Sequence, residues 1–146
     1  LLVRESELEA LVRLVGVDAL PASARLIMQG ARMIREDFLH QNAFDAVDTY
    51  TSQHKQFLLL RNIMAFYRHA KIVFDKGADV EEIARLPALE DISRSKLIAE
   101  EELEKFDGVL DKAKKQLDDL AVSDENETAD ENEAAEENED KTRDEA

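Results

Sequence analysis

The sequence has no cysteine, no tryptophan and only four glycines, and these absences exclude several kinds of functional site. Without cysteine, the chain has no disulfide bond and no thiolate ligand for a metal ion. The glycines are scattered, so no phosphate-binding loop of the form G-x-x-x-x-G-K-S/T is present. The motifs G-x-S-x-G and H-E-x-x-H and the EF-hand loop are absent as well. By itself, the chain is therefore not predicted to be an enzyme.

The remaining candidates for chemistry are three histidines and one adjacent pair of acidic residues. No single helical face joins His40, His54 and His69, so we predict packed or exposed side chains rather than a metal site. Glu36 and Asp37 are consecutive on a predicted helix and point in different directions, which makes a poor acid–base pair. We therefore predict no catalytic residue and no metal-binding residue.

The formal net charge of −15 restricts the partners of the chain. Such a surface repels nucleic acid and anionic membranes unless basic residues gather on one face, and no Lys/Arg run is long enough for that. No apolar run reaches the roughly 18 residues that a transmembrane helix needs, and no secretory signal is recognisable. The chain begins at Leu1, inside a helical pattern, so we interpret it as a piece of a longer polypeptide.

Apolar residues recur at helical spacing over residues 1–120, and no stretch alternates long enough to predict a strand. The expected fold class is all-α, a bundle of about five helices at 4–15, 22–41, 51–75, 78–86 and 89–119. Thr51 or Ser52 is expected to cap the third helix, and Asp79 the fourth. The third helix is apolar on more than one side, so we expect it at the centre of the bundle.

Two features of the apolar pattern indicate how the helices pack. Gly30 interrupts the stripe of the second helix at a cost of roughly 1 kcal/mol relative to alanine, which indicates close packing of another helix there. The last helix has a heptad seam formed by Leu103, Phe106, Leu110, Ala113, Leu117 and Leu120. Such a seam lies either in a groove of the same bundle, which we favour, or against a partner helix in a coiled coil.

The composition changes abruptly after Leu120. Residues 121–146 contain twelve acidic residues against two basic ones, and no aromatic residue. This composition cannot bury enough apolar surface to offset the entropy of ordering, so we predict a disordered acidic tail behind a helical domain of residues 1–120. The tail would act as a solubilising spacer or, alternatively, would bind basic proteins.

The segment between the second and third predicted helices, residues 42–50, is called the hook. It contains two of the few aromatic residues of the chain, Phe44 and Tyr50. These residues either anchor a loop to the bundle or form a slot for a planar group, in which stacking contributes about 0.5–1.5 kcal/mol beyond burial. Asp45 and Asp48 would cap turns within the hook. The residues alone leave both interpretations open.

Three stretches, "LVRLVGVDALP", "ARMIREDFLHQNAFDAVDTYTS" and "KQFLLLRNIMAFY", resemble the C-terminal helical domain of the catalytic A subunit of archaeal and vacuolar-type rotary ATPases. The resemblance covers about residues 1–120 and leaves out the acidic tail. It implies an enzyme that couples ATP hydrolysis or synthesis to the transport of protons or sodium ions. The complete subunit would bind ATP or ADP with Mg²⁺ through an upstream phosphate-binding loop, and this fragment alone would bind no cofactor.

The resemblance also assigns roles to particular residues. In related catalytic subunits two aromatic side chains flank the adenine ring, and the matching positions here are Phe44 and Tyr50. The stretch "VGVDALPAS" matches the loop that pushes on the rotor. Its contact residues for the central stalk would be Val17, Asp18, Leu20 and Pro21. This loop is strongly acidic in related rotary enzymes but has one acidic residue here, so the contact would depend on shape and apolar groups.

The implied partners are the central stalk and the B subunit, in an A3B3 complex at the cytoplasmic side of the membrane. The membrane would be reached only indirectly, through the ion-translocating sector. A rival interpretation from another class is a free-standing acidic helical adaptor or chaperone, which would explain the tail and the heptad seam directly. The sequence leaves open which ion is moved and whether synthesis or hydrolysis dominates.

Overall fold

The computed structural model of the chain describes residues 1–16, 19–40 and 51–122. None of these residues lies in a strand, so the predicted all-α class is confirmed. The elements are α1 (Leu2–Val15), α2 (Ala22–Met33), the π-helical turn η2 (Ile34–Leu39), α4 (Gln53–Asp75), α5 (Val80–Arg85), α6 (Pro87–Arg94), the 3-10 turns η3 (Ser95–Leu97) and η4 (Glu100–Glu102), and a C-terminal helix at 105–122. The hook, Val17, Asp18 and the tail from residue 123 onward lie outside the described residues.

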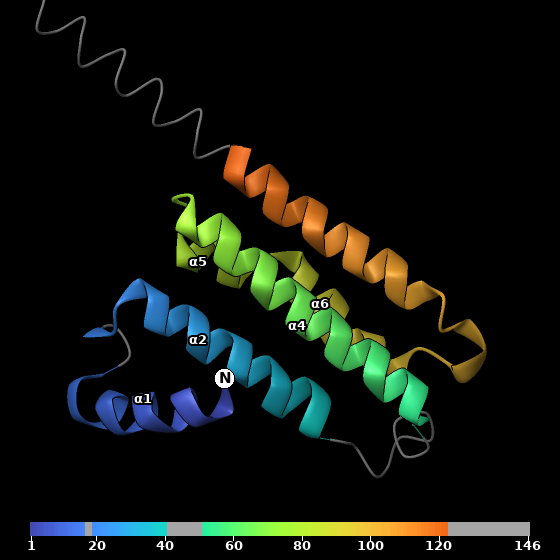
Figure 1. The fold of residues 1–146 in the computed structure, drawn as a ribbon, viewed down its shortest axis with the longest axis horizontal. Helices are drawn as coiled ribbons and strands as arrows, with labels where there is room; N and C mark the ends of the chain where they lie inside the picture. The colour runs from blue at the N-terminus through green and yellow to red at the C-terminus, as the bar shows by residue number, and fades with distance from the viewer. Residues whose placement is uncertain (17–18, 41–50, 123–146) are drawn as a thin grey trace, which may run out of the picture.

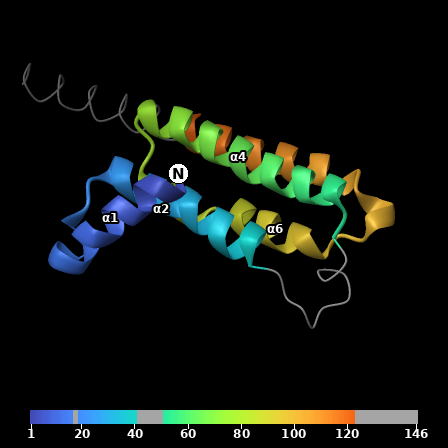
Figure 2. The same ribbon diagram turned by 60° about the horizontal axis from the view of Figure 1, so that its bottom comes forward.

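The long helix α4 lies at the centre of the bundle, as its apolar pattern predicted. Figures 1 and 2 show the C-terminal helix running beside α4, while α2 and α6 cover other sides of it. The buried apolar residues of α4 are Leu58, Leu59, Ile63, Phe66, Ala70 and Val73. They join one core with Ile83 of α5, Ile92 of α6 and Phe106 of the C-terminal helix.

The interruption of the α2 stripe at Gly30 is explained by the approach of α4. A Cβ atom at Gly30 would lie 2.5 Å from Cδ2 of Tyr67, which is closer than any side-chain carbon tolerates. Only the absence of a side chain lets α2 and α4 approach to this distance. The predicted close packing of another helix at Gly30 is therefore confirmed.

The caps of two helices are also as expected. The Ser52 Oγ accepts a hydrogen bond of 3.1 Å from the backbone N–H of Lys55, so Ser52 rather than Thr51 caps α4. Asp79 Oδ1 accepts one of 2.9 Å from the N–H of Glu81 and caps α5. Each bond satisfies a backbone donor that has no partner within its own helix.

The prediction of one continuous helix over 89–119 is wrong. Helix α6 ends at Arg94, and the extended backbone of Ile98 and Ala99 separates two 3-10 turns before the C-terminal helix begins at 105. The buried Ser95 hydroxyl donates a 2.6 Å bond to the carbonyl of Ile92, a local bond that competes with helix continuation. The break reverses the chain, so that the C-terminal helix returns alongside α4 (Figure 1).

The heptad seam itself is correctly predicted and packs within the chain. Phe106, Ala113 and Leu117 are buried in the same core as α4. The intramolecular interpretation of the seam is therefore confirmed, and the coiled coil with a partner is not needed to cover it.

The second predicted helix is shorter than expected and changes type. It was expected to run to residue 41, but α2 passes into η2 at Ile34, and His40 is already extended with ψ of 98°. In a π-turn each backbone hydrogen bond spans one more residue than in an α-helix, so the residues after Met33 face other directions than a continued α-helix would give. No helix in the described part of the chain is long and apolar enough to span a membrane.

Candidate functional site

The candidate site consists of the described residues that hold the two ends of the hook. The predicted adenine residues, Phe44 and Tyr50, lie outside the described residues, so their role stays a prediction. The chain enters the hook from η2, which ends at Leu39, and leaves it at Thr51, just before α4. The structure describes residues on both sides of the hook, and each side makes contacts with a segment that is distant in the sequence.

The junction with α4 is held by the carboxylate of Glu100. The backbone N–H of Ser52 donates a 2.9 Å bond to Oε1 of Glu100, and the Ser52 hydroxyl donates one of 2.7 Å to Oε2. The same hydroxyl accepts the capping bond from Lys55, so it links the helix start to the η4 turn. Gln56 Nε2 adds a 3.3 Å bond to the carbonyl of Thr51. These bonds fix the direction in which the chain enters α4.

The ionisation of Glu100 follows from these contacts. The two bonds donated by Ser52 stabilise the charged carboxylate and lower its pKa, with a smaller contribution from the positive charge of Lys55. The side chain is exposed, and its slight burial opposes the shift. Glu100 is therefore held as an anion, the form that accepts both bonds at once.

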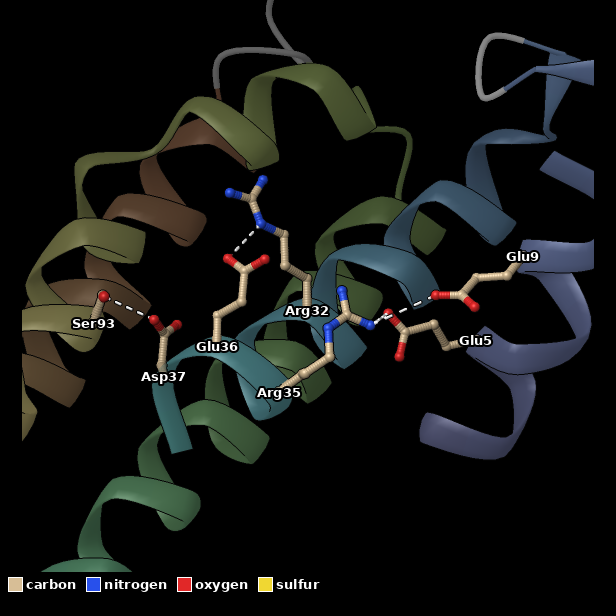
Figure 3. Close-up of polar contacts among 7 residues, drawn as sticks. All are labelled: Glu5, Glu9, Arg32, Arg35, Glu36, Asp37 and Ser93. Atoms are coloured by element: carbon tan, nitrogen blue, oxygen red, sulfur yellow. Dashed lines mark hydrogen bonds and ion pairs between the residues drawn. The ribbon is translucent and has the colours of Figure 1, made fainter. Parts of the chain in front are cut away.

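On the η2 side, Asp37 precedes the hook by five residues and takes part in a hydrogen bond between two helices. The Ser93 hydroxyl of α6 donates a 2.7 Å bond to Oδ1 of Asp37 in η2 (Figure 3). Asp37 is half-buried, and this burial raises its pKa, while the bond from Ser93 and the positive charge of Lys96 counteract the rise. The two junctions are thus tied by Ser93 and by Glu100, which belong to one short segment of the chain.

A buried lysine that sequence reasoning missed lies at the start of α4. Lys55 is fully buried, and its Nζ has no hydrogen-bond partner in the described part of the chain. A buried ammonium group without a hydrogen bond is costly. The positive charge of Lys55 makes a minor contribution to lowering the pKa of Glu100, after the bonds from Ser52. The signal was present in the sequence: Lys55 lies four residues before Leu59 and seven residues before Asn62, on the buried stripe of α4.

A second buried polar residue of α4 has a structural partner. The Asn62 side chain donates a 2.7 Å bond to the backbone carbonyl of Phe106. Arg61 donates to the Asn62 oxygen, and it also pairs with Asp107 at 2.7 Å. This network fixes the first turn of the C-terminal helix against α4 and leaves no polar group of Asn62 unsatisfied.

The predicted stalk contact is described only in part. Val17 and Asp18 lie outside the described residues. The Leu20 side chain is 3% exposed and packs inside the chain, whereas Pro21 is exposed and immediately precedes α2. At this end of the molecule, the C-terminal end of α1 presents apolar groups to solvent, with Leu14 83% exposed.

Helix α1 is joined to the bundle by an ion pair. Arg35 of η2 pairs with the buried carboxylate of Glu5 and lies 3.8 Å from Glu9, as Figure 3 shows. Arg32 points away from this pair and bonds Glu36 at 2.8 Å on its own helix. The region of η2 therefore contacts α1 on one side and α6 on the other.

The described residues offer no site for a metal or a free anion. None of their His, Asp and Glu side chains form a group of three that could hold a metal ion. A pocket of about 290 Å³ near α2 and α5 is lined by three arginines, but each is paired with a carboxylate. The pairs are Arg25–Glu81 at 2.9 Å, Arg32–Glu36 at 2.8 Å and Arg35–Glu5. In the described part of the chain, the arginines around this pocket are therefore paired with carboxylates.

Comparison with known proteins agrees with this description. The sequence profile of the family described as the C-terminal domain of V and A type ATP synthase matches residues 1–86. The A subunit of the A-type ATP synthase of Methanopyrus kandleri is 50% identical over 121 residues, which are 82% of this chain and 20% of the relative. The V-type ATP synthase alpha chain of Thermoanaerobacter pseudethanolicus is 47% identical over 120 residues, with the same two coverages.

A third relative, the A subunit of the A-type ATP synthase of Thermococcus sibiricus, is 47% identical over 120 residues. The chain spans 20% of the length of each of these curated relatives. The family profile covers more than half of the chain and contains all three sequence stretches that carried the predicted resemblance, so that prediction is confirmed. The chain belongs to the family formed by the C-terminal domain of V and A type ATP synthases.

Proposed function

We propose that the chain acts as the C-terminal part of the catalytic A subunit of an A/V-type rotary ATPase. The observation that carries the proposal is the family match over residues 1–86, supported by 50% identity to the Methanopyrus kandleri relative. The complete subunit would bind ATP or ADP with Mg²⁺ and couple ATP hydrolysis or synthesis to proton or sodium transport. Its partners would be the central stalk and the B subunit, in an A3B3 complex at the cytoplasmic side of the membrane.

The proposed contribution to nucleotide binding is one wall of the adenine pocket. Phe44 and Tyr50 would stack on the adenine ring, an interaction worth about 0.5–1.5 kcal/mol beyond burial. The phosphate-binding loop, the general base and the Mg²⁺ ligands would come from the part of the subunit upstream of Leu1. The support for this role from the fold is that both junctions of the hook are held by hydrogen bonds to Ser93 and Glu100.

The adenine role is tested by Tyr50→Ala in the intact complex. Loss of about 1 kcal/mol of stacking should raise the KM for ATP by about threefold to tenfold, with kcat at saturating ATP little changed. Ile72→Ala is a matched control, because it removes an exposed apolar side chain (53% exposed) near the other end of α4. An unchanged KM in the Tyr50 variant would return both aromatic residues to a packing role.

The proposed contribution to rotation is an apolar contact with the central stalk at the α1–α2 end of the molecule. Leu14, Val15 and Pro21 expose their side chains there, while Leu20 is buried and would support the loop from inside. Leu14→Ser combined with Val15→Ser should lower the number of ions pumped per ATP hydrolysed without lowering hydrolysis itself. If that ratio is unchanged, the stalk contact lies elsewhere.

The free-standing adaptor loses its main structural argument. The adaptor interpretation relied on a heptad seam that would be exposed and would bind a partner helix. The seam residues Phe106 and Leu117 are instead fully buried in the core of this chain. The acidic tail from residue 123 onward lies outside the described residues and favours neither proposal.

A further inference from the structure

Two neighbouring cavities along α2 and η2 have no role in the function proposed above. The first, of about 290 Å³, is the pocket with three arginines near α2 and α5, and the second, of about 280 Å³, lies where η2 meets α6. They share the lining residues Gln29, Arg32 and Ala84, so they form one continuous groove, called the α2 groove. Small-molecule sites usually have volumes of roughly 300–1,000 Å³ and enclose their ligand. Each cavity lies below this range and is open to solvent, which suits the side chains of a bound peptide segment better than a whole small molecule.

The two ends of the α2 groove differ in their chemistry. The walls of the first cavity are largely apolar and include Leu26, Met28, Val80 and Ile83. The second cavity is lined by Glu36, Asp37 and Ser93, and Arg32 is the basic residue of its lining. Arg32 is already paired with Glu36 at 2.8 Å. A complementary segment therefore carries an apolar side chain at one end and a positive charge at the other.

Asp37 is the acidic residue of the groove that lacks a cationic partner among the described residues. Its Oδ1 accepts the 2.7 Å bond from Ser93, and its Oδ2 has no hydrogen bond in the part of the chain that the structure describes (Figure 3). Half burial raises the pKa of Asp37, so the charge of this carboxylate is incompletely compensated. The charge of Lys96 counteracts the rise, but no ion pair joins the two described residues. A basic side chain in the second cavity would supply the missing pair.

The place of α1 indicates which segment can reach the groove. The chain spans 20% of the length of its relatives and belongs to a family of C-terminal domains, and the proposed function places the rest of the subunit upstream. Glu5 of α1 lines the first cavity and pairs with Arg35 of η2 (Figure 3). The helix rises only about 6 Å from Leu1 to Glu5. A segment joined to the chain at Leu1 is therefore held near the groove at a high effective concentration.

We propose that the α2 groove is the docking site for a segment of the same subunit upstream of Leu1, which places an apolar side chain in the first cavity and a Lys or Arg at Asp37. The inference rests on the proposed function, because that function supplies the upstream part. Asp37 lies nine residues after Met28, a rise of at most about 14 Å along a helix. An extended segment covers this distance in about four residues, which sets the spacing between its apolar and its basic residue.

The first experiment measures whether the groove is covered in the complete subunit. Ala84→Cys places a thiol at an exposed residue that lines both cavities. Glu82→Cys is the matched control, because Glu82 is exposed on the same helix and lines neither cavity. A maleimide should label the thiol of Ala84→Cys at least about tenfold more slowly than that of Glu82→Cys, because the docked segment must first open. Equal rates, read at the two residues by peptide mass spectrometry, would contradict the docking.

The second experiment tests the charge at Asp37. Asp37→Asn removes the charge and retains an acceptor for Ser93, so the melting temperature of the subunit should not fall. Combined with Ala84→Cys, it should raise the labelling rate of the thiol by about threefold to tenfold, because the docked basic group loses its partner. Glu82→Gln removes an equal charge outside the groove and should leave the rate unchanged. No rise with Asp37→Asn, or an equal rise with Glu82→Gln, would show that no basic group binds at Asp37.

The third experiment identifies the occupant. A photo-reactive maleimide is attached to the thiol of Ala84→Cys, and the complete subunit is irradiated alone and in the assembled complex. We expect a cross-link to a peptide upstream of Leu1 that carries a Lys or Arg within about four residues of an apolar side chain. A cross-link to another subunit, to a second copy of this chain or to lipid would overturn the proposal. An upstream peptide without a basic residue, or no cross-link at all, would do the same.

The outcomes also separate the docking from the proposed function. If the groove is open while Tyr50→Ala raises the KM for ATP in the intact complex, the docking is wrong and the proposed function stands. If the groove is covered by the expected peptide while Tyr50→Ala leaves the KM unchanged, the docking stands and the adenine contact is wrong. If the gene encodes no subunit upstream of Leu1, the proposed function and the docking are both wrong.

Discussion

Helices α1 and α4 are held in the fold by different kinds of contact. The buried residues of α4 run along its length and join one apolar core with α5, α6 and the C-terminal helix. The buried residue of α1 is Glu5, an acidic side chain paired with Arg35. Of the apolar groups of α1, Leu8 and Val12 are partly buried, whereas Leu14, Val3 and Val15 are more than half exposed.

Under the proposed function, the difference would let one small domain serve two purposes. Apolar burial is the large and non-directional contribution to stability. Helix α4 is therefore the firmly packed element that follows the hook in the chain. Helix α1 gains little from burial within this chain and leaves an apolar face uncovered. Such a face is typical of a surface used for contact with another part of an assembly. In the proposed function, α4 supports the nucleotide side and α1 the side of the stalk.

The largest expected effect tests this contrast directly. Phe66→Ala empties a position that is 1% exposed at the centre of α4 and should lower the free energy of unfolding by about 3–5 kcal/mol. Leu14→Ala removes a side chain of α1 that is 83% exposed and should change it by less than about 0.5 kcal/mol. Urea denaturation of the two variants measures both. Similar losses would show that α1 is packed as firmly as α4.

The next effect concerns the close approach of α2 and α4. Gly30→Ala places a carbon against the base of the Tyr67 ring, where the ring cannot swing away, so the helices must separate. We expect a loss of about 1–3 kcal/mol. Gly108→Ala is the matched control, because a Cβ there meets nothing within 4 Å. On the C-terminal helix this change should stabilise the chain by about 0.5–1 kcal/mol. A stable Gly30→Ala variant would contradict the tight α2–α4 contact.

A smaller effect is expected at the ion pair that joins α1. Arg35→Ala leaves the Glu5 carboxylate buried without its partner, which should cost about 1–2 kcal/mol because Arg35 itself is half-exposed to solvent. Arg32→Ala removes an exposed pair within one helix and should cost less than about 0.5 kcal/mol.

Hydrogen exchange locates the loss at Arg35. Amide protons of α1 should exchange faster in the Arg35→Ala variant, while those of α4 keep their protection. Faster exchange in both helices would show that α1 and α4 unfold as one unit, and the contrast between them would then disappear.

The sequence predicted the features that depend on local pattern. The central place of α4 followed from its apolar residues on two sides, and the contact at Gly30 followed from a gap in a stripe. Ser52 and Asp79 were recognisable as helix caps by residue type and place. The family followed from long stretches of matching sequence.

The features that were missed depend on contacts between distant residues. Nothing in the helix propensity of residues 89–119 requires a break, since the stretch has no proline and its single glycine, Gly108, lies inside the observed C-terminal helix. The observed break instead lets α6 and the C-terminal helix pack on different sides of α4, with Ile92 and Phe106 in the same core. The bonds of Glu100 and Ser93 join residues that periodicity does not relate. For the π-turn at Ile34 we find no signal in the sequence.

The smallest expected effect distinguishes the two ends of the hook by their response to acid. The pKa of Glu100 is lowered by the bonds from Ser52, so Glu100 stabilises the folded chain above its unfolded value of 4.5. This contribution is lost as the pH falls through the lower, folded pKa. Glu100→Gln should therefore cost a few tenths of a kcal/mol near neutral pH, a screened value for an exposed group, and the cost should vanish below that pKa.

Asp37 should respond with the opposite sign. Its pKa is raised by burial above the unfolded value of 3.8, so the folded chain binds this proton more tightly and gains stability as the pH falls through the raised pKa. Asp37→Asn, which still accepts the bond from Ser93, should equal or exceed the wild type by a few tenths of a kcal/mol at neutral pH. That advantage should shrink in acid. Urea denaturation at pH 7 and at acid pH, with both variants beside the wild type, measures the two signs in one series. Equal signs would mean that burial does not dominate at Asp37, and the two ends of the hook would then be held in the same way.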